Sequence, residues 1–559
     1  MIFLTSIGSD IYTDAGDSEA IRTKEKAIAA DLQQIATERS AAVIGRIAQR
    51  GRLTAQNRVE RLCDSGSRIW YLGEYEGFDR EPNDAHKPWR LGVICAIGEI
   101  AGRRAVIIAN DNTVTAGAWH PGTPEKIERA QKLALRLGLP VFYLVECAGL
   151  YLPEQDKSFA GATGAGAIFE LQAQLNRAGI LQLAAVFGDC VAGGGYMPLL
   201  ADRIVMTEQA TICIGGNALN ASSKGMEGGR LGGPDIHVHI SGCAEERAQN
   251  DDDAIEKLRE WASLMPSPAD AYFRMAESIE SPYPIDDLYK IIPADISKPY
   301  CISQVIARLV DGGQAQVLYE DTGKEVLTVL ALIDGLPAVL IASNPEQTES
   351  KDDHAVHAGS ILYKESIIKM RRVCENARED GIPVIWLQDV AGFDIGYEAE
   401  RQGLLKYGAM ILRELSCDRR EDPPHLCILL RKASGAGYYA MKGAPFHPAW
   451  IVATALTHLE VMAPETLADT LYHKKLLALD NTPESAAKRA SVEASRSELI
   501  ARQTECSKPQ SAAIRGDVDC IVPLNELRNL VITFVQSAYQ STIHPRKPQR
   551  LWSTGNDSL

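Results

Sequence analysis

The chain has 559 residues and carries a net charge of −15, with 45% hydrophobic and 23% charged residues. This length exceeds what a single hydrophobic core usually supports, so two domains of about 250 residues each are expected. The negative charge, without a long basic stripe to offset it, disfavours nucleic acid and anionic lipid as partners.

The first half of the chain begins with a polar tail and a helical stretch over residues 19–50. From residue 92 to 240, strand-like and helical segments alternate, which predicts parallel strands joined by crossover helices. One of these helices should have Thr123 as its hydroxyl N-cap and Pro124 in its first turn, and should end near Leu137.

Two further segments of the first half contain residue types that also bind metals. His237 and His239 alternate as on a strand, and without a third ligand at suitable spacing they indicate a structural pair. Residues 251–262 indicate an acidic helix whose three aspartates form a solvated helix start. We therefore expect that this chain requires no metal.

A proline-rich segment at residues 281–287 indicates a connection between domains. We place the boundary there, with a first domain over residues 1–280 and a second domain over residues 281–559. The second domain is expected to contain a helix over residues 361–380.

The twelve cysteines are scattered, with no C-x-x-C pair, and several lie in apolar strand-like runs. Free thiols in a reducing compartment explain this pattern better than disulfides or a metal site. No stretch approaches the roughly 20 apolar residues of a membrane span, and the first residues lack the basic flank of a signal peptide. We expect a cytoplasmic chain that is peripheral to a membrane only through partner subunits.

In each half, two apolar strand-like runs end in glycine turns, and the two sets lie 243 residues apart. The matching pairs are Pro140 and Pro383, Gly149 and Gly392, and Gly194 and Gly437. A fixed period that serves three landmarks indicates duplicated structural units. The sequence therefore predicts two copies of one α/β unit, each with two glycine turns at strand ends.

A glycine after a strand lets backbone N–H groups approach a ligand closely. Two such N–H groups from different turns form an oxyanion hole, which stabilises an enolate oxygen. A single glycine turn more often serves only close packing. Because the set of turns is duplicated, we favour ligand binding over packing alone.

Several segments of the chain occur together in one known family. They are residues 192–195, 291–300, 431–437 and 516–523. Over about residues 50–540 the chain resembles the carboxyltransferase subunits of biotin-dependent enzymes. The resemblance implies an α/β fold with two tandem crotonase-like (ββα spiral) domains related by internal duplication.

Within this family, residues 116–122, 147–149, 154–157, 305–309 and 388–396 are most similar to the α subunits of glutaconyl-CoA decarboxylases. The resemblance implies transfer of CO2 from glutaconyl-CoA to biotin, which gives crotonyl-CoA. The alternative is a carboxyltransferase β subunit of an acyl-CoA carboxylase acting on crotonyl-, methylcrotonyl-, geranyl- or propionyl-CoA. A catalytically silent scaffold subunit is a third interpretation, which the glycine turns in both halves disfavour.

The resemblance also gives the two sets of turns different roles. The first domain should bind the acyl-CoA thioester, and the second should bind the ureido group of biotin. The N–H groups expected to act are those of Leu150 with Gly193 or Gly194 for the thioester, and of Phe393 with Ala436 or Gly437 for biotin. Further binding positions are Ala116, Gly117, Ala118, Gly149, Gly195, Gly392 and Gly435.

Biotin is expected to arrive on a separate carrier subunit. Residues 440–442 begin like a biotin attachment motif around Lys442, but Gly443 replaces its second methionine. A membrane decarboxylase subunit or a biotin carboxylase would be a further partner. Related enzymes also imply a homo-oligomer.

Four residues near the turns bear on these assignments. Ala436 interrupts the second glycine run, although it still offers a backbone N–H. Met197 stands where crotonase-type hydratases tend to carry a glutamate, which disfavours a hydratase. Asp389 and Asp394 flank the second-half turn, either to orient biotin or a partner or to cap the following helix.

Overall fold

The computed structural model describes residues 4–10, 14, 16–37, 39, 41–78, 89–215, 232–265, 274–350, 354–416, 422–479 and 483–541. These residues form two compact units. The N-terminal unit comprises residues 30–265 and 536–541, and the C-terminal unit comprises residues 4–29 and 274–535. The division falls inside two helices, α1 (Ser18–Thr37) and α20 (Leu527–Gln540). Residues 281–287, which we predicted to connect the domains, lie within the C-terminal unit.

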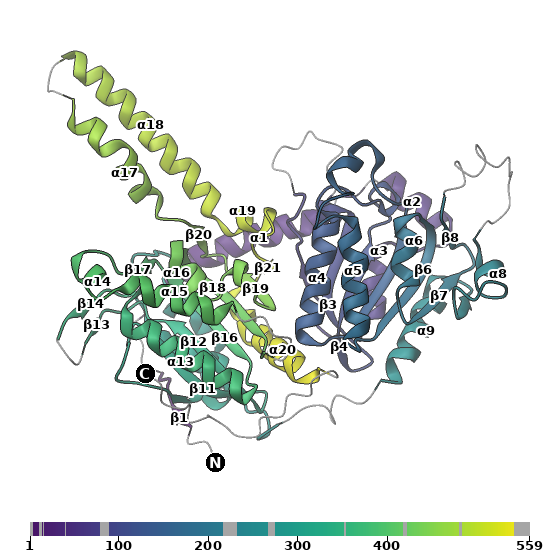
Figure 1. Cartoon of the computed structure of the whole chain (residues 1–559), viewed down its shortest axis with the longest axis horizontal. Helices are drawn as coiled ribbons and strands as arrows, with labels where there is room; N and C mark the ends of the chain where they lie inside the picture. The colour runs from purple at the N-terminus through teal and green to yellow at the C-terminus, as the bar shows by residue number, and fades with distance from the viewer. Residues whose placement is uncertain are drawn as a thin grey trace. The chain divides into compact units, whose positions relative to one another are not determined.

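The N-terminal unit is built on a mixed sheet, which has eight strands in the part of the chain that the structure describes (Figure 1). In sheet order they are β2 (Trp70–Leu72), β3 (Val93–Ile100), β4 (Arg103–Asn110), β5 (Val141–Cys147), β6 (Gln182–Val191), β7 (Arg203–Thr207) and β9 (Glu246–Ala248), while β8 (Thr211–Cys213) also pairs with β6. The pairs β2–β3 and β3–β4 are antiparallel, and the others are parallel. All of β5 is buried, as expected for a central strand covered on both faces.

The helices of this unit lie before, between and after the strands of the sheet. They are α2 (Ala41–Gln49), α3 (Ala55–Leu62), α4 (Thr123–Leu137), α5 (Ala165–Arg177), α6 (Gly193–Leu199), α8 (Pro234–His237) and α9 (Asp251–Ser263), with short 3-10 turns η1 (Trp89–Gly92), η2 (Thr115–Gly117) and η3 (Leu152–Lys157). Helix α4 ends as predicted, at a left-handed Gly138 whose N–H donates to the Ala134 carbonyl. Its N-cap is Gly122, so Thr123 is the first helical residue and the predicted threonine cap is wrong.

Two other predicted segments differ from the structure. The stretch over residues 19–50 contains two helices, α1 and α2, instead of one. His237 ends helix α8 and His239 follows in a turn, so the predicted strand is wrong. The Nδ1 atom of His237 lies 2.9 Å from Ser241 Oγ, and its Nε2 lies 2.8 Å from the Ile212 carbonyl. These contacts give His237 the structural role that we predicted.

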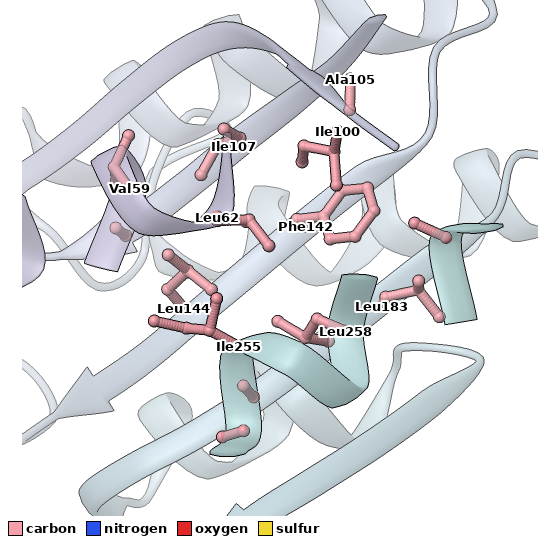
Figure 2. Close-up of a cluster of buried hydrophobic side chains, with 14 of the residues drawn as sticks. Val59, Leu62, Ile100, Ala105, Ile107, Phe142, Leu144, Leu183, Ile255 and Leu258 are labelled. Atoms are coloured by element: carbon pink, nitrogen blue, oxygen red, sulfur yellow. The ribbon is translucent and has the colours of Figure 1, made fainter. Parts of the chain in front are cut away.

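Helices α3 and α9 cover one face of the N-terminal sheet with apolar side chains (Figure 2). The cluster includes Val59 and Leu62 from α3, Ile255 and Leu258 from α9, and Ile107, Phe142, Leu144 and Leu183 from the sheet. The helical members recur three residues apart, which places them on one side of each helix. Burial of this apolar surface fixes α3 and α9 against β4, β5 and β6.

The C-terminal unit has a second mixed sheet (Figure 1). In sheet order its described strands are β1 (Thr5–Ser6), β10 (Gln314–Val317), β11 (Val326–Ile333), β12 (Leu336–Ser343), β16 (Val384–Val390), β18 (His425–Ser434), β19 (Trp450–Ala453) and β21 (Cys520–Ile521), while β20 (His458–Glu460) also pairs with β18. Two small sheets pair β13 (Thr348–Glu349) with β14 (Val356–His357), and β15 (Ile361–Leu362) with β17 (Gly392–Phe393).

The helices of the C-terminal unit are α11 (Leu288–Ile291), α12 (Ile302–Leu309), α13 (Lys364–Asp380), α14 (Tyr397–Arg401), α15 (Leu404–Leu415), α16 (Gly435–Ala440), α17 (Pro464–Leu477), α18 (Pro483–Ser507) and α19 (Pro509–Ile514), with 3-10 turns η4 (Ile285–Asp287), η5 (Asp311–Gly313), η6 (Ala444–Phe446) and η7 (Leu524–Glu526). The helix predicted over residues 361–380 begins later, at Lys364, because Ile361 and Leu362 pair with β17. Helices α17 and α18 form a hairpin that extends away from the sheet (Figure 1).

The two sheets share one topology, which confirms the predicted duplication. In each, an antiparallel pair, β3–β4 or β11–β12, is followed by parallel strands in the same order. The period of 243 residues also holds for backbone conformation, because Gly138 and Gly381 have φ of 68° and 69°. Ala192 and Gly435, also one period apart, have φ of 51° and 54°.

The eleven cysteines of the described residues are free thiols, and Cys417 lies outside those residues. Among the described helices, none combines the length and apolar character that a membrane crossing needs.

Replacing Leu258 with alanine should lower the free energy of unfolding by about 2–5 kcal/mol, because the side chain is fully buried and its removal leaves a cavity. Leu264 directly follows the same helix but is 77% exposed, so Leu264→Ala should change stability by less than about 0.5 kcal/mol. Urea denaturation followed by circular dichroism measures both. Equal losses would contradict this account of the core.

Candidate active site

The first predicted turn, at Gly149 and Leu150, follows β5 and is fixed by a short parallel bridge to Trp119. The N–H of Trp119 donates to the Gly149 carbonyl at 2.9 Å, and the N–H of Tyr151 donates to the Trp119 carbonyl at 2.9 Å. Leu150 lies between these two bonds and pairs with Trp119 across the bridge. In a parallel bridge the N–H of the bridged residue points away from the partner strand. Within the described residues the Leu150 N–H has no hydrogen-bond acceptor, so it is available to a ligand.

The segment that lies beside this turn has an unusual backbone. Ala116 and Gly117 have φ of 53° and 73°, in the left-handed region. A Cβ atom on Gly117 would lie only 1.9 Å from the Glu146 carbonyl oxygen, so only glycine fits. Its neighbour Ala118 is buried. Ala116, Gly117 and Ala118 therefore shape the backbone against which the turn at Gly149 lies.

The second turn of the N-terminal unit starts helix α6. Ala192 precedes the helix with φ of 51°, and its N–H donates to the Cys213 carbonyl at 3.0 Å. The N–H groups of Gly193 and Gly194 open the helix and have no acceptor within it. A Cβ on Gly194 would lie 2.7 Å from the Cys147 carbonyl oxygen, so α6 begins directly against the end of β5.

The two N-terminal turns are in contact with each other. A Cβ on Gly149 would lie 3.4 Å from the Val191 carbonyl oxygen, which is an ordinary van der Waals distance. The next residue of α6, Gly195, lies against Ile212 of β8, since a Cβ on Gly195 would lie 3.2 Å from an Ile212 methyl carbon. The structure thus gathers the predicted residues of the first domain at adjoining ends of β5 and β6.

The C-terminal unit repeats this arrangement with one unforeseen residue. The N–H of Ala391 donates to the Ser360 carbonyl at 2.8 Å, and the N–H of Asp394 donates to the Leu362 carbonyl at 3.0 Å. Gly392, with φ of 146°, and the predicted residue Phe393 lie between these bonds. Ser360 has φ of 63° and occupies the place that Ala116 has in the first unit. The glycine pattern gave no signal for a serine in this role.

Helix α16 begins against this second turn. A Cβ on Gly437 would lie 3.0 Å from Gly392 Cα, and a Cβ on Gly435 would lie 3.0 Å from the Val461 carbonyl oxygen. Ala436 lies in the first turn of α16, so its N–H, like that of Gly437, has no acceptor within the helix. The alanine therefore interrupts the glycine run without removing a donor.

Asp389 holds the end of β16 in place. Its carboxylate accepts a hydrogen bond from Arg431 Nε at 2.7 Å and one from the backbone N–H of Lys432 at 3.1 Å. The side chains of Asp389 and Arg431 are both fully buried. Arg431 also donates to the carbonyls of Asp295 and Lys298. The predicted alternatives for Asp389, orienting a ligand or capping a helix, are thus replaced by an ion pair between β16 and β18.

This ion pair also explains residues 291–300, one of the segments that carry the family resemblance. The segment wraps around Arg431, and its last residue, Tyr300, places its ring 4.5 Å from the guanidinium. Burial and the nearby Asp389 carboxylate raise the pKa of Tyr300 well above its usual value. The tyrosine is therefore a neutral neighbour of the pair at any physiological pH.

The N-terminal unit stabilises its equivalent strand with different residues. Glu146 lies one period before Asp389, and its carboxylate forms ion pairs with Arg52 and Arg58. Gly188 lies one period before Arg431, and a Cβ there would collide with the Arg52 guanidinium. Arg52, which lies outside the sheet, thus fills the space in the N-terminal unit that Arg431 of β18 fills in the C-terminal unit.

Aromatic side chains pack beside the start of α6, which the glycine pattern could not reveal. The Trp119 ring would lie 3.3 Å from a Cβ on Gly193, and the Phe169 ring centroid is 6.1 Å from that of Trp119. The Tyr196 ring makes an edge-to-face contact with the Phe169 ring, and Tyr196 is 52% exposed. Beneath the turn, burial raises the pKa of Cys147 to about 12, so its thiol is not an ionised nucleophile at neutral pH.

Gly194→Ala should reduce turnover at least about tenfold, because its Cβ forces the start of α6 away from β5 and displaces an N–H donor. Gly166→Ala on α5 is the matched control, since a Cβ there meets no atom within 4 Å. Steady-state kinetics on folded protein measure both. Unchanged turnover in Gly194→Ala would contradict the assignment of this turn.

Asp389→Ala should destabilise the protein by about 3–5 kcal/mol, because Arg431 then remains as an unpaired buried charge. Asp469 forms an exposed pair with Arg496, so Asp469→Ala should cost at most about 1 kcal/mol. Urea denaturation distinguishes the two, and a loss below 1 kcal/mol for Asp389→Ala would contradict the proposed role of the ion pair.

Comparison with known proteins identifies the family. A model described as the carboxyl transferase domain matches residues 46–551. The biotin-dependent 3-methylcrotonyl-coenzyme A carboxylase beta1 subunit of Mycobacterium tuberculosis is 33% identical over 425 residues, 76% of each chain. The glutaconyl-CoA decarboxylase subunit alpha of Acidaminococcus fermentans is 29% identical over 518 residues, 88% of this chain and 86% of that protein.

A solved structure supports the same fold. The beta subunit of geranyl-CoA carboxylase from P. aeruginosa is similar with a TM-score of 0.81 at 24% identity, over 98% of this chain and 99% of that chain. The two duplicated units are accordingly tandem crotonase-like domains. The chain belongs to the carboxyl transferase domain family.

Proposed function

We propose that this chain is the carboxyltransferase subunit of a biotin-dependent acyl-CoA carboxylase whose substrate is an α,β-unsaturated acyl-CoA. The observation that carries the proposal is the pair of glycine turns in each unit. The Leu150 N–H has no partner in the described chain, and the first N–H groups of α6 and α16 have no acceptor within their helices. The match of residues 46–551 to the carboxyl transferase domain family supports carboxyl transfer as the reaction at these turns.

The relatives favour a carboxylase over the decarboxylase that the sequence motifs suggested first. Two methylcrotonyl-CoA carboxylase subunits, from M. tuberculosis and Dictyostelium discoideum, are each 33% identical to the chain. The decarboxylase subunit is 29% identical. Methylcrotonyl and glutaconyl groups are both α,β-unsaturated, which is why we assign this class of acyl group.

The N-terminal unit is proposed to bind the thioester. Breaking or forming the C–C bond to the carboxyl group places negative charge on the thioester oxygen, and in an unsaturated acyl group this charge is shared along the chain. The N–H groups of Leu150 and of Gly193 or Gly194 would donate to that oxygen. One such donor commonly contributes about 3–4 kcal/mol to transition-state stabilisation. The flat rings of Trp119 and Phe169 suit a planar, conjugated acyl group.

The C-terminal unit is proposed to bind biotin through the N–H groups of Phe393 and of Ala436 or Gly437. These donors fit a urea oxygen, which is a hydrogen-bond acceptor. When bound, biotin supplies a ureido nitrogen that exchanges a proton for the carboxyl group, and that proton balances the charge on the acyl carbon. No nucleophilic side chain is needed in this scheme.

The biotin is proposed to belong to a separate carrier subunit. Lys442, in the incomplete attachment motif, is 5% exposed and donates to the Leu415 carbonyl at 2.9 Å, so it is not accessible for modification. A biotin carboxylase would be the further partner of a carboxylase. A homo-oligomer follows only by analogy with related enzymes.

Glutaconyl-CoA decarboxylation remains a second candidate because its subunit alpha matches 88% of this chain, more than the 76% matched by the M. tuberculosis carboxylase subunit. In that case the partner would be a membrane decarboxylase subunit. The same two sets of N–H groups would serve the reaction in the opposite direction.

The test uses purified protein, free biotin and three carboxylated thioesters, with products measured by chromatography. Biotin-dependent decarboxylation should be at least about tenfold faster with 3-methylglutaconyl-CoA or glutaconyl-CoA than with saturated methylmalonyl-CoA. A preference for 3-methylglutaconyl-CoA supports the carboxylase, and a preference for glutaconyl-CoA supports the decarboxylase. Preference for methylmalonyl-CoA would exclude an unsaturated substrate, and no biotin-dependent product would overturn the proposed function.

A further inference from the structure

A cavity of about 430 Å³ lies beside the second glycine turn of the C-terminal unit. Strand β20 and the segment after it form one wall, and α17, α18 and the end of α19 form the others. Apolar residues such as Leu459 and Met462 line it together with the polar residues Glu460, Gln503 and Arg515. This mixture and size are typical of a pocket for a small organic ligand.

Glu460 connects this cavity to the turn. It pairs with Ser434 across β18 and β20, and Ser434 directly precedes Gly435. The next residue, Val461, places its carbonyl oxygen 3.0 Å from the position of a Cβ on Gly435. The Oε2 atom of Glu460 is buried and has no hydrogen-bond partner in the described chain. A buried, unsatisfied carboxylate oxygen at a cavity wall is costly unless a ligand uses it.

The duplication supplies an internal comparison. In the N-terminal unit, β8 pairs with β6 as β20 pairs with β18, and Cys213 stands opposite Val191 as Glu460 stands opposite Ser434. The fold therefore forms this turn equally well with a thiol at that position. The acid is a feature of the C-terminal unit alone, which is the unit assigned to biotin.

The charged groups around Glu460 come from several elements. Burial and the charge of Glu465 on α17 raise the pKa of Glu460 to about 7. A side-chain hydrogen bond with Ser507 on α18 acts in the opposite direction and lowers this pKa. Arg515 is engaged by Asp517 at 2.8 Å. Two further titratable groups face this region, the Cys506 thiol and His458, and burial together with Lys24 and Lys508 lowers the pKa of His458.

We propose that the Glu460 carboxylate accepts a hydrogen bond from an N–H of the biotin urea while the cavity takes the apolar part of the ring. This inference rests on the proposed function. The turn N–H groups satisfy the urea oxygen but cannot satisfy the urea N–H, which needs an acceptor. Glu460 supplies that acceptor beside the same turn, so it contacts and orients the ligand.

The test measures the KM for free biotin in the transfer assay and direct binding of biocytin by saturation-transfer NMR, between pH 6 and 8.5. Because the carboxylate is the acceptor, affinity should rise as the pH increases through about 7. Glu460→Gln should weaken binding about tenfold or more at pH 8 and remove this pH dependence, with a smaller effect on kcat. Glu465→Gln, the control on α17, should keep tight binding and move the midpoint to lower pH.

Two outcomes separate this inference from the proposed function. If wild-type protein transfers the carboxyl group to biotin but Glu460→Gln keeps the wild-type KM, biocytin affinity and pH profile, the Glu460 contact is wrong and the function stands. Affinity that falls as the pH rises would also overturn the contact. If wild-type protein shows no biotin-dependent transfer, the proposed function itself is wrong.

Discussion

The glycine turns depend on buried ion pairs that fix the ends of the strands before them. In the C-terminal unit Asp389 at the end of β16 is joined to Arg431 on β18. In the N-terminal unit Glu146 at the end of β5 is joined to Arg52 and Arg58. Charges this deeply buried are stable only as pairs, so each carboxylate holds its arginine and its strand end in one position. An oxyanion hole needs such rigidity, because its donors must already point at the oxygen before charge develops there.

Comparison of the two duplicated units distinguishes the features that both copies share from the residues that only one copy has. A residue with positive φ stands at the same place in both copies, Ala192 just before α6 and Gly435 as the first residue of α16. Both turns also lie against a neighbouring strand end, so these features belong to the fold. Other positions differ between the copies. A thiol at Cys213 corresponds to a carboxylic acid at Glu460, and the aromatic rings of Trp119 and Phe169 lie beside Gly193 at the start of α6. These differences are consistent with one copy binding an acyl group and the other binding a polar urea.

The sequence predicted the duplication and the turns because both depend on glycine, whose positions are visible without a structure. Gly138 and Gly381, one period apart, share the same left-handed conformation. Ser360 could not be found in this way, since its left-handed φ leaves no trace in residue type. Thirty residues separate β4 from β5 but forty separate β12 from β16, so the period also fails in this segment. The role of Asp389 was missed because its partner, Arg431, lies on the neighbouring strand rather than nearby in sequence.

A crystal structure with an unsaturated acyl-CoA and biotin bound would test the central claim most directly. The account predicts the thioester oxygen at about 2.7–3.1 Å from the N–H nitrogens of Leu150 and of Gly193 or Gly194. It predicts the biotin urea oxygen at a similar distance from the nitrogens of Phe393 and of Ala436 or Gly437. A thioester oxygen bound at the C-terminal turns, or facing neither set of N–H groups, would contradict it.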